Sequence, residues 1–323
     1  MKGMSVDQLR QRVQPRRSVS GIAAALLPFE TDGRIAVDAF QQNLRATHDS
    51  GLTNAVNMDT GYVNYLKPEE RQRVLSWTRE ALGPSTPFVA GAYVEGSEHS
   101  EGSVAQWYRH EMDRIAQFGA TPILFPTARL RGFPAAEKAA AYREACQGFP
   151  AALAFELSPV FAPNGELFDD ETVRSLMDIP ELKGMKHSSL DRLLELERLE
   201  LRNTHRPEFR IYTGNDLGID MIEYGSDYLL GLAAFAPEKF AERDRLWRDG
   251  DARYYALSDA LQHLGNVAFR APVPAYKHSA AVFLHLCGRI PSPRTHPDNP
   301  QRPEWEAEIL QDCAARLGIV PRP

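Results

Sequence analysis

Residues 182–189 have the sequence Leu182-Lys183-Gly184-Met185-Lys186-His187-Ser188-Ser189. A short apolar run that ends in small polar residues is typical of a buried strand followed by a loop. Lys186 then stands where this strand ends. An amine among apolar neighbours loses affinity for its proton and becomes a nucleophile toward carbonyl carbon. A solvated lysine at a strand end is the ordinary alternative, so the rest of the chain decides between the two.

Seven further segments have the composition of buried strands. They are 21–29, 53–58, 87–93, 121–126, 151–157, 209–213 and 227–232. Helical segments alternate with them and are expected at 37–47, from Pro68, at 103–118, 135–146, 169–177, 190–201 and 216–224, and from Pro237. Eight strand–helix units spaced by about 30 residues predict an α/β fold, the closed (β/α)8 or TIM barrel.

The barrel accounts for only part of the chain. We expect an N-terminal arm over residues 1–20, the barrel over 21–242 and a helical C-terminal extension over 243–323. In the extension, the four-residue spacing of Ile309, Cys313 and Leu317 predicts one apolar helix face.

Composition excludes several classes of protein. The 323 residues are 43% hydrophobic and 25% charged with a net charge of -6, which argues against a nucleic-acid partner. No run approaches the ~18 apolar residues of a membrane span, and the N-terminus lacks the apolar segment of a signal peptide. Cys146, Cys287 and Cys313 are widely spaced, as in reduced proteins. We expect a cytoplasmic protein with a small-molecule partner.

Active sites of such barrels lie at the carboxyl ends of the strands. The polar and aromatic residues at these ends are Asp59, Thr60, Gly61, Tyr62, Tyr93, Glu95, Thr127, Phe155, Glu156, Lys186, His187, Thr213, Asn215 and Asp216. Lys186 is the only lysine among them. This position favours the nucleophile over the solvated strand end.

Several motifs resemble the dihydrodipicolinate synthase and N-acetylneuraminate lyase family of class I aldolases. They are 21–29 with Asp32-Gly33, Asp59-Thr60-Gly61, 66–71, 88–91, 184–189, Thr213-Gly214-Asn215-Asp216 and 272–277. The resemblance runs from about Gly21 to the C-terminus. It implies a barrel with a helical extension, usually a homotetramer, no cofactor, and Lys186 as the Schiff-base lysine. We expect a homo-oligomer (dimer or tetramer) and, because no paired metal-ligand motif occurs in the sequence, no metal.

The sequence departs from the family pattern after the second strand. The family has a glycine, two hydroxyl residues, a glycine and a glutamate there, which hold the carboxylate of a 2-oxo acid such as pyruvate. This chain has Met58-Asp59-Thr60-Gly61-Tyr62. Thr60 keeps one hydroxyl, but Asp59 puts a carboxylate where an anion should bind. Two like charges at ~4 Å repel by about 1 kcal/mol even in water.

The fifth strand carries the second departure. Phe155 stands where the family has a proton-relaying tyrosine, and Val160 stands near the position of an arginine found in some members. Proton transfer would then use Tyr62, Tyr93, Glu156, a histidine or a water. Strand alternation turns His187 away from the barrel axis and raises the same objection to Glu156.

We therefore predict a lyase, an aldolase or dehydratase, that forms an imine at Lys186 with a 2-oxo acid or related carbonyl compound. The expected catalytic residues are Lys186, Thr60 and Tyr62, and the expected substrate-binding residues are Asp59, Gly61, Tyr93, Phe155, Glu156 and Thr213. Three readings stay open: a changed substrate, the pyruvate-type substrate with Asp59 turned away, and a ligand-binding barrel without chemistry. A metal-dependent barrel would need Asp59, Glu95, Glu156 and His187 to converge.

Overall fold

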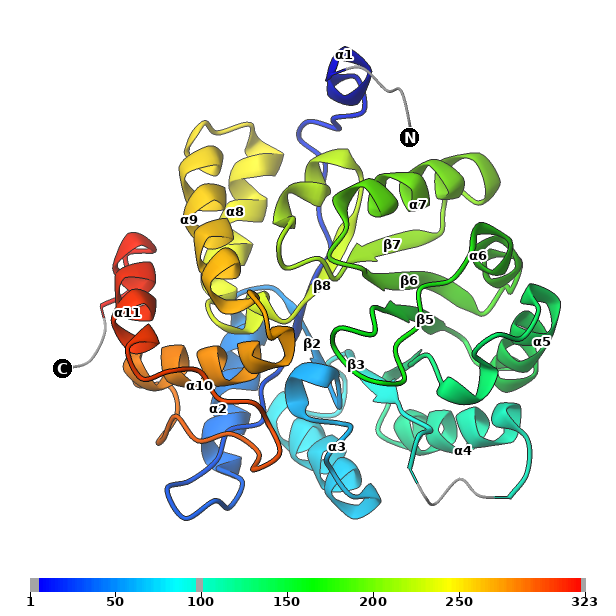
Figure 1. The fold of residues 1–323 in the computed structure, drawn as a ribbon, viewed down its shortest axis with the longest axis horizontal. Helices are drawn as coiled ribbons and strands as arrows, with labels where there is room; N and C mark the ends of the chain where they lie inside the picture. The colour runs from blue at the N-terminus through cyan, green and yellow to red at the C-terminus, as the bar shows by residue number, and fades with distance from the viewer. Residues whose placement is uncertain (1–5, 97–100, 321–323) are drawn as a thin grey trace.

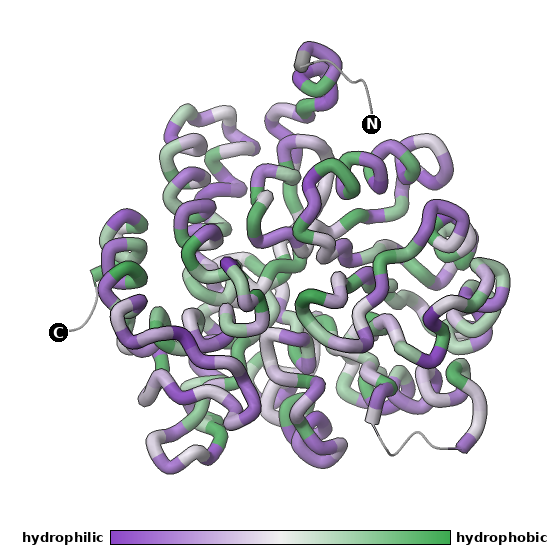
Figure 2. Tube along the Cα trace, in the orientation of Figure 1, coloured by the Kyte–Doolittle hydropathy of each residue, from purple (hydrophilic) through white to green (hydrophobic). Residues whose placement is uncertain are grey.

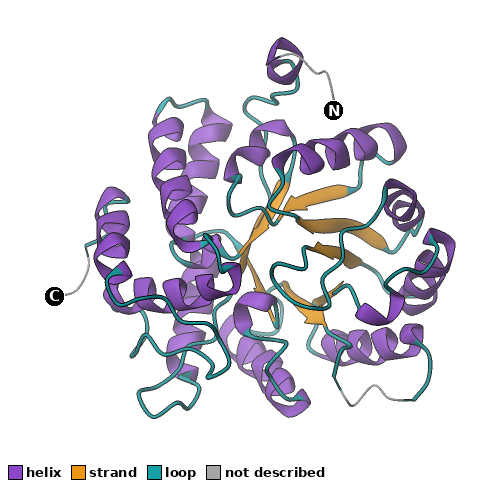
Figure 3. Cartoon of the chain, in the orientation of Figure 1, coloured by secondary structure: helices purple, strands orange, loops and turns teal. Residues whose placement is uncertain are grey.

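The computed structural model describes residues 6–96 and 101–320 and contains a closed barrel of parallel strands. The strands are β1 Gly21–Ala24, β2 Thr53–Val56, β3 Phe88–Ala92, β4 Thr121–Leu124, β5 Ala152–Leu157, β6 Leu182–Ser188, β7 Arg210–Thr213 and β8 Asp227–Leu230. Strand β1 pairs with both β2 and β8, so the sheet has no free edge. Figure 3 shows the strands at the centre, surrounded by helices. The predicted (β/α)8 barrel is confirmed.

Helices follow the strands as the sequence predicts. They are α2 Val37–Asp49, α3 Pro68–Leu82, α4 Val104–Gln117, α5 Ala135–Cys146, α6 Asp170–Met177, α7 Arg192–His205 and α8 Pro237–Asp249. Local signals set where they begin: Ser103 caps α4 by accepting a hydrogen bond from the backbone of Gln106, and Asp191 caps α7 in the same manner. The helix expected over 216–224 is instead a 3₁₀ helix, η3 Ile219–Tyr224. The side chain of Asn215 accepts a bond from the Leu217 backbone and holds a turn before it.

The barrel wall is buried on both faces, as parallel strands require. Every residue of β3 and β5 is buried. Figure 2 shows hydrophobic and hydrophilic segments alternating along the outer helices, which pack their apolar side on the strands.

The C-terminal extension consists of helices. These are α9 Arg253–Ala268, η5 Val273–Ala275, α10 Tyr276–Leu286 and α11 Glu306–Arg316. Helix α9 packs beside α8 and α11, as Figure 1 shows. The boundary expected at residue 242 lies within α8. None of the helices in the described part of the chain is long and apolar enough to cross a bilayer.

The N-terminal arm is attached to the amino-terminal end of the barrel. It includes α1 Val6–Arg10. Further along, the guanidinium of Arg17 donates hydrogen bonds to the Asp227 carboxylate at 2.8 Å and to the Ser226 carbonyl at 2.7 Å. This arginine therefore anchors the arm to the start of β8.

Candidate active site

Lys186 lies near the end of β6, with its side chain on the inner side of the barrel. Its strand partner is Phe155 on β5, and Lys186 Nζ lies 4.5 Å from the centroid of that ring. The lysine is only 6% exposed. Burial lowers its pKa to about 8, while the negative charges of Asp216 and Asp59 act in the opposite direction. About a tenth of the amine is therefore unprotonated at pH 7, far more than for an ordinary lysine.

The absence of a side chain at Gly214 leaves the space that Lys186 occupies. A Cβ atom at Gly214 would lie 1.9 Å from the Ser188 Oγ and 2.7 Å from the Lys186 Cε. These distances are far below van der Waals contact. The glycine that follows β7 therefore allows the lysine stem to run against the β7 backbone.

Asp59 opens the short 3₁₀ helix η1 Asp59–Gly61, which follows β2, and its carboxylate is buried. Its Oδ1 accepts a hydrogen bond from Lys277 Nζ at 3.1 Å, and its Oδ2 accepts one from the Tyr276 hydroxyl at 2.9 Å. The Thr60 hydroxyl lies 2.8 Å from the Tyr276 oxygen. Asp59 is thus paired with a cation inside the protein. The negative charge of Asp59, which the sequence alone did not explain, is therefore compensated by Lys277.

The partners of Asp59 come from the C-terminal extension. Tyr276 and Lys277 begin α10, and both are buried. The Lys277 ammonium also lies 5.9 Å from the ring centroids of Tyr62 and Tyr65. The extension is therefore part of the site and supplies the cation that pairs with Asp59.

Asp216 is the second carboxylate near Lys186. It lies between β7 and η3, and its Oδ1 accepts a hydrogen bond from the backbone N–H of Leu232 at 2.8 Å. Burial raises the pKa of Asp216 to about 7, against the opposing effects of that bond and of the Lys186 charge. Asp216 can therefore hold a proton at neutral pH and give it up to a reacting group.

The sequence of the chain is similar to that of 4-hydroxy-tetrahydrodipicolinate synthase of Kosmotoga olearia. The identity is 24% over 242 residues, which cover 71% of this chain and 75% of that protein. No protein-family model matches the chain. The chain therefore resembles the dihydrodipicolinate synthase family at low sequence identity.

Solved structures share the fold. Dihydrodipicolinate synthase of Thermotoga maritima has a TM-score of 0.79 at 17% identity, covering 94% of this chain and 100% of that chain. A putative dihydrodipicolinate synthetase of Pseudomonas aeruginosa has a TM-score of 0.77 at 18% identity, covering 93% of this chain and 100% of that chain. A prophage protein of the family from E. coli K12, solved in complex with pyruvate, has a TM-score of 0.78 at 17% identity, covering 93% of this chain and 99% of that chain.

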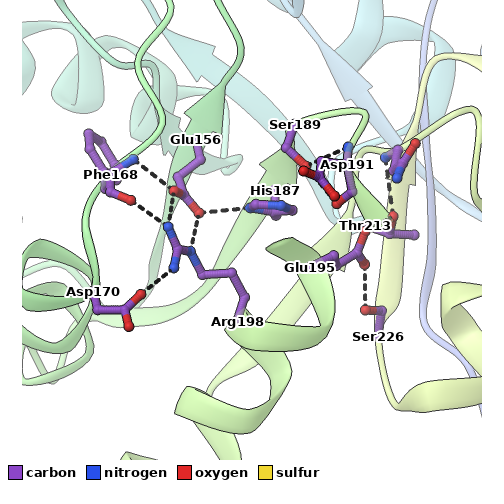
Figure 4. Close-up of polar contacts among 11 residues, drawn as sticks. Glu156, Phe168, Asp170, His187, Ser189, Asp191, Glu195, Arg198, Thr213 and Ser226 are labelled. Carbon is purple, nitrogen blue, oxygen red and sulfur yellow. Dashed lines mark hydrogen bonds and ion pairs between the residues drawn. The ribbon is translucent and has the colours of Figure 1, made fainter. Parts of the chain in front are cut away.

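Two of the expected substrate-binding residues have side chains that point out of the barrel, toward the surrounding helices. Glu156 is fully buried, and its carboxylate accepts hydrogen bonds from Arg198 at 3.1 Å, from the Phe168 backbone at 2.8 Å, and contacts His187 Nδ1 at 2.8 Å. Figure 4 shows this network between the strands and α7. The ion pairs hold the pKa of Glu156 at about 2 despite burial. Glu156 therefore belongs to the packing of α7 on the barrel, and its expected place in the substrate pocket is wrong.

Thr213 is the second expected substrate-binding residue whose side chain points out of the barrel. Its hydroxyl donates a hydrogen bond to Glu195 Oε2 at 2.8 Å, and Ser226 donates to the other oxygen of the same carboxylate at 2.6 Å (Figure 4). Thr213 pairs in register with His187, so both side chains leave the barrel axis on the same face. The expectation that Thr213 binds substrate is corrected for this reason.

Tyr62 and Gly61 lie beside the site. Tyr62 is completely buried, and its ring packs against Phe29 and His296 with centroid distances of 5.7 and 6.2 Å. Its hydroxyl has no hydrogen-bond partner among residues 6–96 and 101–320. A Cβ at Gly61 would lie 3.2 Å from the Ala25 carbonyl oxygen, so this glycine lets η1 approach the end of β1.

Aromatic rings form the wall on the β3–β5 side. Tyr93 packs edge-on against Phe125 at 5.7 Å, and Phe125 packs edge-on against Phe155 at 4.9 Å. Phe155 in turn lies under the lysine. The row connects the predicted residues Tyr93 and Phe155 to Lys186 as an apolar surface, which is what lowers the affinity of the amine for its proton.

A loop crosses the mouth of the barrel above these residues. Phe161, between β5 and α6, packs edge-on against Tyr276 with a centroid distance of 6.4 Å. Tyr276 stacks on Phe269 of the extension at 4.3 Å. These contacts join the β5–α6 loop to the C-terminal extension.

A metal-dependent enzyme would need Asp59, Glu95, Glu156 and His187 to converge on one point. In the described ranges, no group of three or more histidine, cysteine, aspartate or glutamate side chains is arranged to hold a metal ion. Glu95 instead accepts a hydrogen bond from the Ala128 backbone at 3.0 Å.

Sequence reasoning gave no role in the site to three residues that lie in it, Asp216, Tyr276 and Lys277. Asp216 was recognised as a residue at a strand end, yet nothing local predicts its burial beside Lys186. Tyr276 and Lys277 lie in the segment 272–277 that carries part of the family resemblance. That resemblance was the only signal for them, because Asp59 and Tyr276 are 217 positions apart.

Proposed function

We propose that this protein is a lyase of the class I aldolase type that forms an imine between Lys186 and a carbonyl substrate. The observation that carries the proposal is the burial of Lys186 Nζ against the Phe155 ring. The negative charge of Asp216 acts on the pKa of this lysine, so the two groups are neighbours. A desolvated amine beside a protonated acid is the arrangement that carbonyl addition needs. The sequence similarity to a dihydrodipicolinate synthase supports the same chemistry.

Lys186 and Asp216 together supply the amine and the protons that imine formation needs. The neutral amine of Lys186 attacks the carbonyl carbon, and the carbonyl oxygen takes up protons and leaves as water. One of those protons comes from Asp216, and the other comes from the amine. The products are a protonated imine, water and the ionised Asp216. The imine then accepts the electron pair of the breaking C–C or C–H bond, which gives an enamine.

The substrate class follows from Asp59. Both of its oxygens accept hydrogen bonds from side chains of α10, so the carboxylate stays inside the site. A substrate carboxylate beside the imine would lie next to this anion, and Lys277 already compensates Asp59. We favour an uncharged aldehyde or ketone over a 2-oxo acid, with pyruvate as the competing substrate because one relative was solved with it.

Borohydride trapping tests the proposal. The probes are pyruvate, 2-oxoglutarate, propanal and acetone, and intact mass with peptide mapping locates the adduct. We expect an adduct on Lys186, none in Lys186→Ala, and the full adduct in Lys183→Ala. Lys183 is the matched control, because it lies on the same strand and is exposed. An adduct with pyruvate alone would reverse the substrate assignment. No adduct with any probe would favour a ligand-binding barrel without chemistry.

Two further expectations belong to this proposal. Reduced cysteines and the soluble character of the family support a cytoplasmic location. The family resemblance supports a homodimer or homotetramer, which light scattering after size exclusion would measure.

A further inference from the structure

Four side chains form a directed chain of hydrogen bonds beside Lys186. The Tyr276 hydroxyl has one proton, and it is donated to Asp59 Oδ2 at 2.9 Å. Its contact with Thr60 Oγ1 at 2.8 Å must then be a bond that Thr60 donates. Lys277 donates to the other oxygen of Asp59. The donor and the acceptor of each hydrogen bond in this chain are therefore determined.

The residue that is paired with Lys186 on the neighbouring strand cannot move a proton. Phe155 lies directly against Lys186 and has no hydroxyl. The charges of Asp59 and Asp216 both act on Lys186, and both act on Tyr276. The lysine and the tyrosine thus share the same two carboxylates as neighbours. Phe161 and Phe269 pack on the Tyr276 ring and hold it in place.

We propose that Tyr276, which the C-terminal extension supplies, is the residue that moves the proton between the substrate's α-carbon and Asp59. This inference rests on the proposed imine chemistry and names the group that completes it. Thr60 and Lys277 are positioning residues: Thr60 orients the tyrosine oxygen, and Lys277 holds Asp59.

The step is a relay through a neutral phenol. The C–H bond at the α-carbon of the protonated imine breaks, and its electron pair forms the C=C bond of the enamine while the C=N π electrons move to nitrogen. The proton from carbon goes to the Tyr276 oxygen as the tyrosine's own proton goes to Asp59 Oδ2. The reverse transfer protonates the enamine. Burial raises the pKa of Tyr276 well above its ordinary value, so the residue relays a proton without becoming a phenolate.

Other candidates are less well placed. Glu156 and His187 bond each other outside the barrel wall. The Tyr62 ring packs between Phe29 and His296 beside the site. Asp216 is held by the Leu232 backbone and already has the part of the acid in imine formation. Tyr276 has both a hydrogen-bond donor, Thr60, and a base, Asp59, attached to its hydroxyl.

Hydrogen exchange separates this step from imine formation. Wild type and Tyr276→Phe are incubated in D2O with whichever of pyruvate, acetone or propanal gives the strongest borohydride adduct. Loss of the α-hydrogen signal is followed by NMR, with Lys186→Ala as the background. We expect Tyr276→Phe to trap the probe within about twofold of wild type and to exchange roughly 10²-fold more slowly, the usual loss for a positioned acid–base group.

Tyr228→Phe is the matched control. Tyr228 is fully buried and donates to the Asp244 carboxylate at 2.7 Å, on the outer side of the barrel. Its loss should leave both trapping and exchange unchanged.

Three outcomes are distinguishable. Slow exchange with normal trapping supports the relay. Exchange at the wild-type rate, or an equal loss of trapping and exchange in Tyr276→Phe, overturns it and leaves the imine proposal standing. No adduct with any probe in the wild type overturns both proposals.

Discussion

Lys186 and Phe155 occupy paired positions on neighbouring parallel strands, and the lysine Nζ lies 4.5 Å from the centre of the ring. The face of the ring favours the ammonium form by about 0.5–2 kcal/mol. Burial opposes it and prevails, since the pKa of Lys186 falls to about 8. The same ring has no proton to give. The pair therefore provides a nucleophile and leaves the proton relay to another residue.

A tyrosine restored at position 155 should replace a lost Tyr276. In the double variant Phe155→Tyr with Tyr276→Phe, we expect α-hydrogen exchange to recover at least tenfold over Tyr276→Phe alone. The new hydroxyl would stand at the ring that faces Lys186. Phe155→Tyr alone should change exchange little, because Tyr276 already serves. The measurement is NMR exchange in D2O, and exchange that stays at the level of the single variant would contradict the prediction.

Gly214→Ala should slow imine formation. The new Cβ would lie 2.7 Å from Lys186 Cε and 1.9 Å from Ser188 Oγ, so the lysine stem must move. We expect a loss of about 1–3 kcal/mol in the free energy of unfolding and trapping at least tenfold slower. Denaturant unfolding and the rate of borohydride adduct formation measure the two effects.

A second substitution separates these effects. Ser188→Ala in the Gly214→Ala background removes the hydroxyl contact but not the contact with Lys186. It should restore part of the stability and leave trapping slow. Full recovery of trapping would mean that Gly214 makes room for Ser188 alone.

Asp216→Asn should shift the pH dependence of imine formation. The rate in the wild type should rise as the Lys186 amine loses its proton and fall as Asp216 loses the proton that it donates, with a maximum between about pH 7 and 8. The negative charge of Asp216 favours the ammonium, so its removal lowers the pKa of Lys186 and moves this rise to lower pH. The maximal rate should also fall because an acid is lost. Asp170→Asn, at an exposed carboxylate, is the control. A rise at the same pH in Asp216→Asn would refute the coupling.

Glu195 should make stability depend on pH. Burial raises the pKa of this carboxyl to about 7, with Thr213 and Ser226 bonded to it and the charges of His187 and Asp220 nearby. The folded state then binds more protons than the unfolded state from about pH 4.5 to 7, so stability falls as pH rises through this window. The stability of Glu195→Gln should not fall in this way, because glutamine does not titrate. We expect the stability of the variant relative to wild type to increase by on the order of 3 kcal/mol from pH 5 to pH 8. Denaturant unfolding at both pH values checks this, and a constant difference would exclude the effect.

Local patterns in the sequence were sufficient for the barrel and for the place of Lys186. The apolar runs and the helix signals between them determine the order of strands and helices. Since a strand alternates its faces, the sequence also predicts that His187 turns away from the axis, where it contacts Glu156. The same alternation accounts for the outward side chains of Glu156 and Thr213, which were expected in the pocket because both lie at strand ends.

Only the tertiary structure decided what surrounds the lysine. The charge of Asp59 is compensated by Lys277, 218 positions later in the chain, and its proton donor Tyr276 comes from the same helix. No local pattern encodes such a contact, because it depends on how the barrel closes and on the path of the C-terminal extension over its mouth. Burial of Asp216 has the same origin. Local patterns were therefore enough for the barrel and for the position of Lys186, whereas the positions of Asp59, Asp216 and Tyr276 depend on long-range packing.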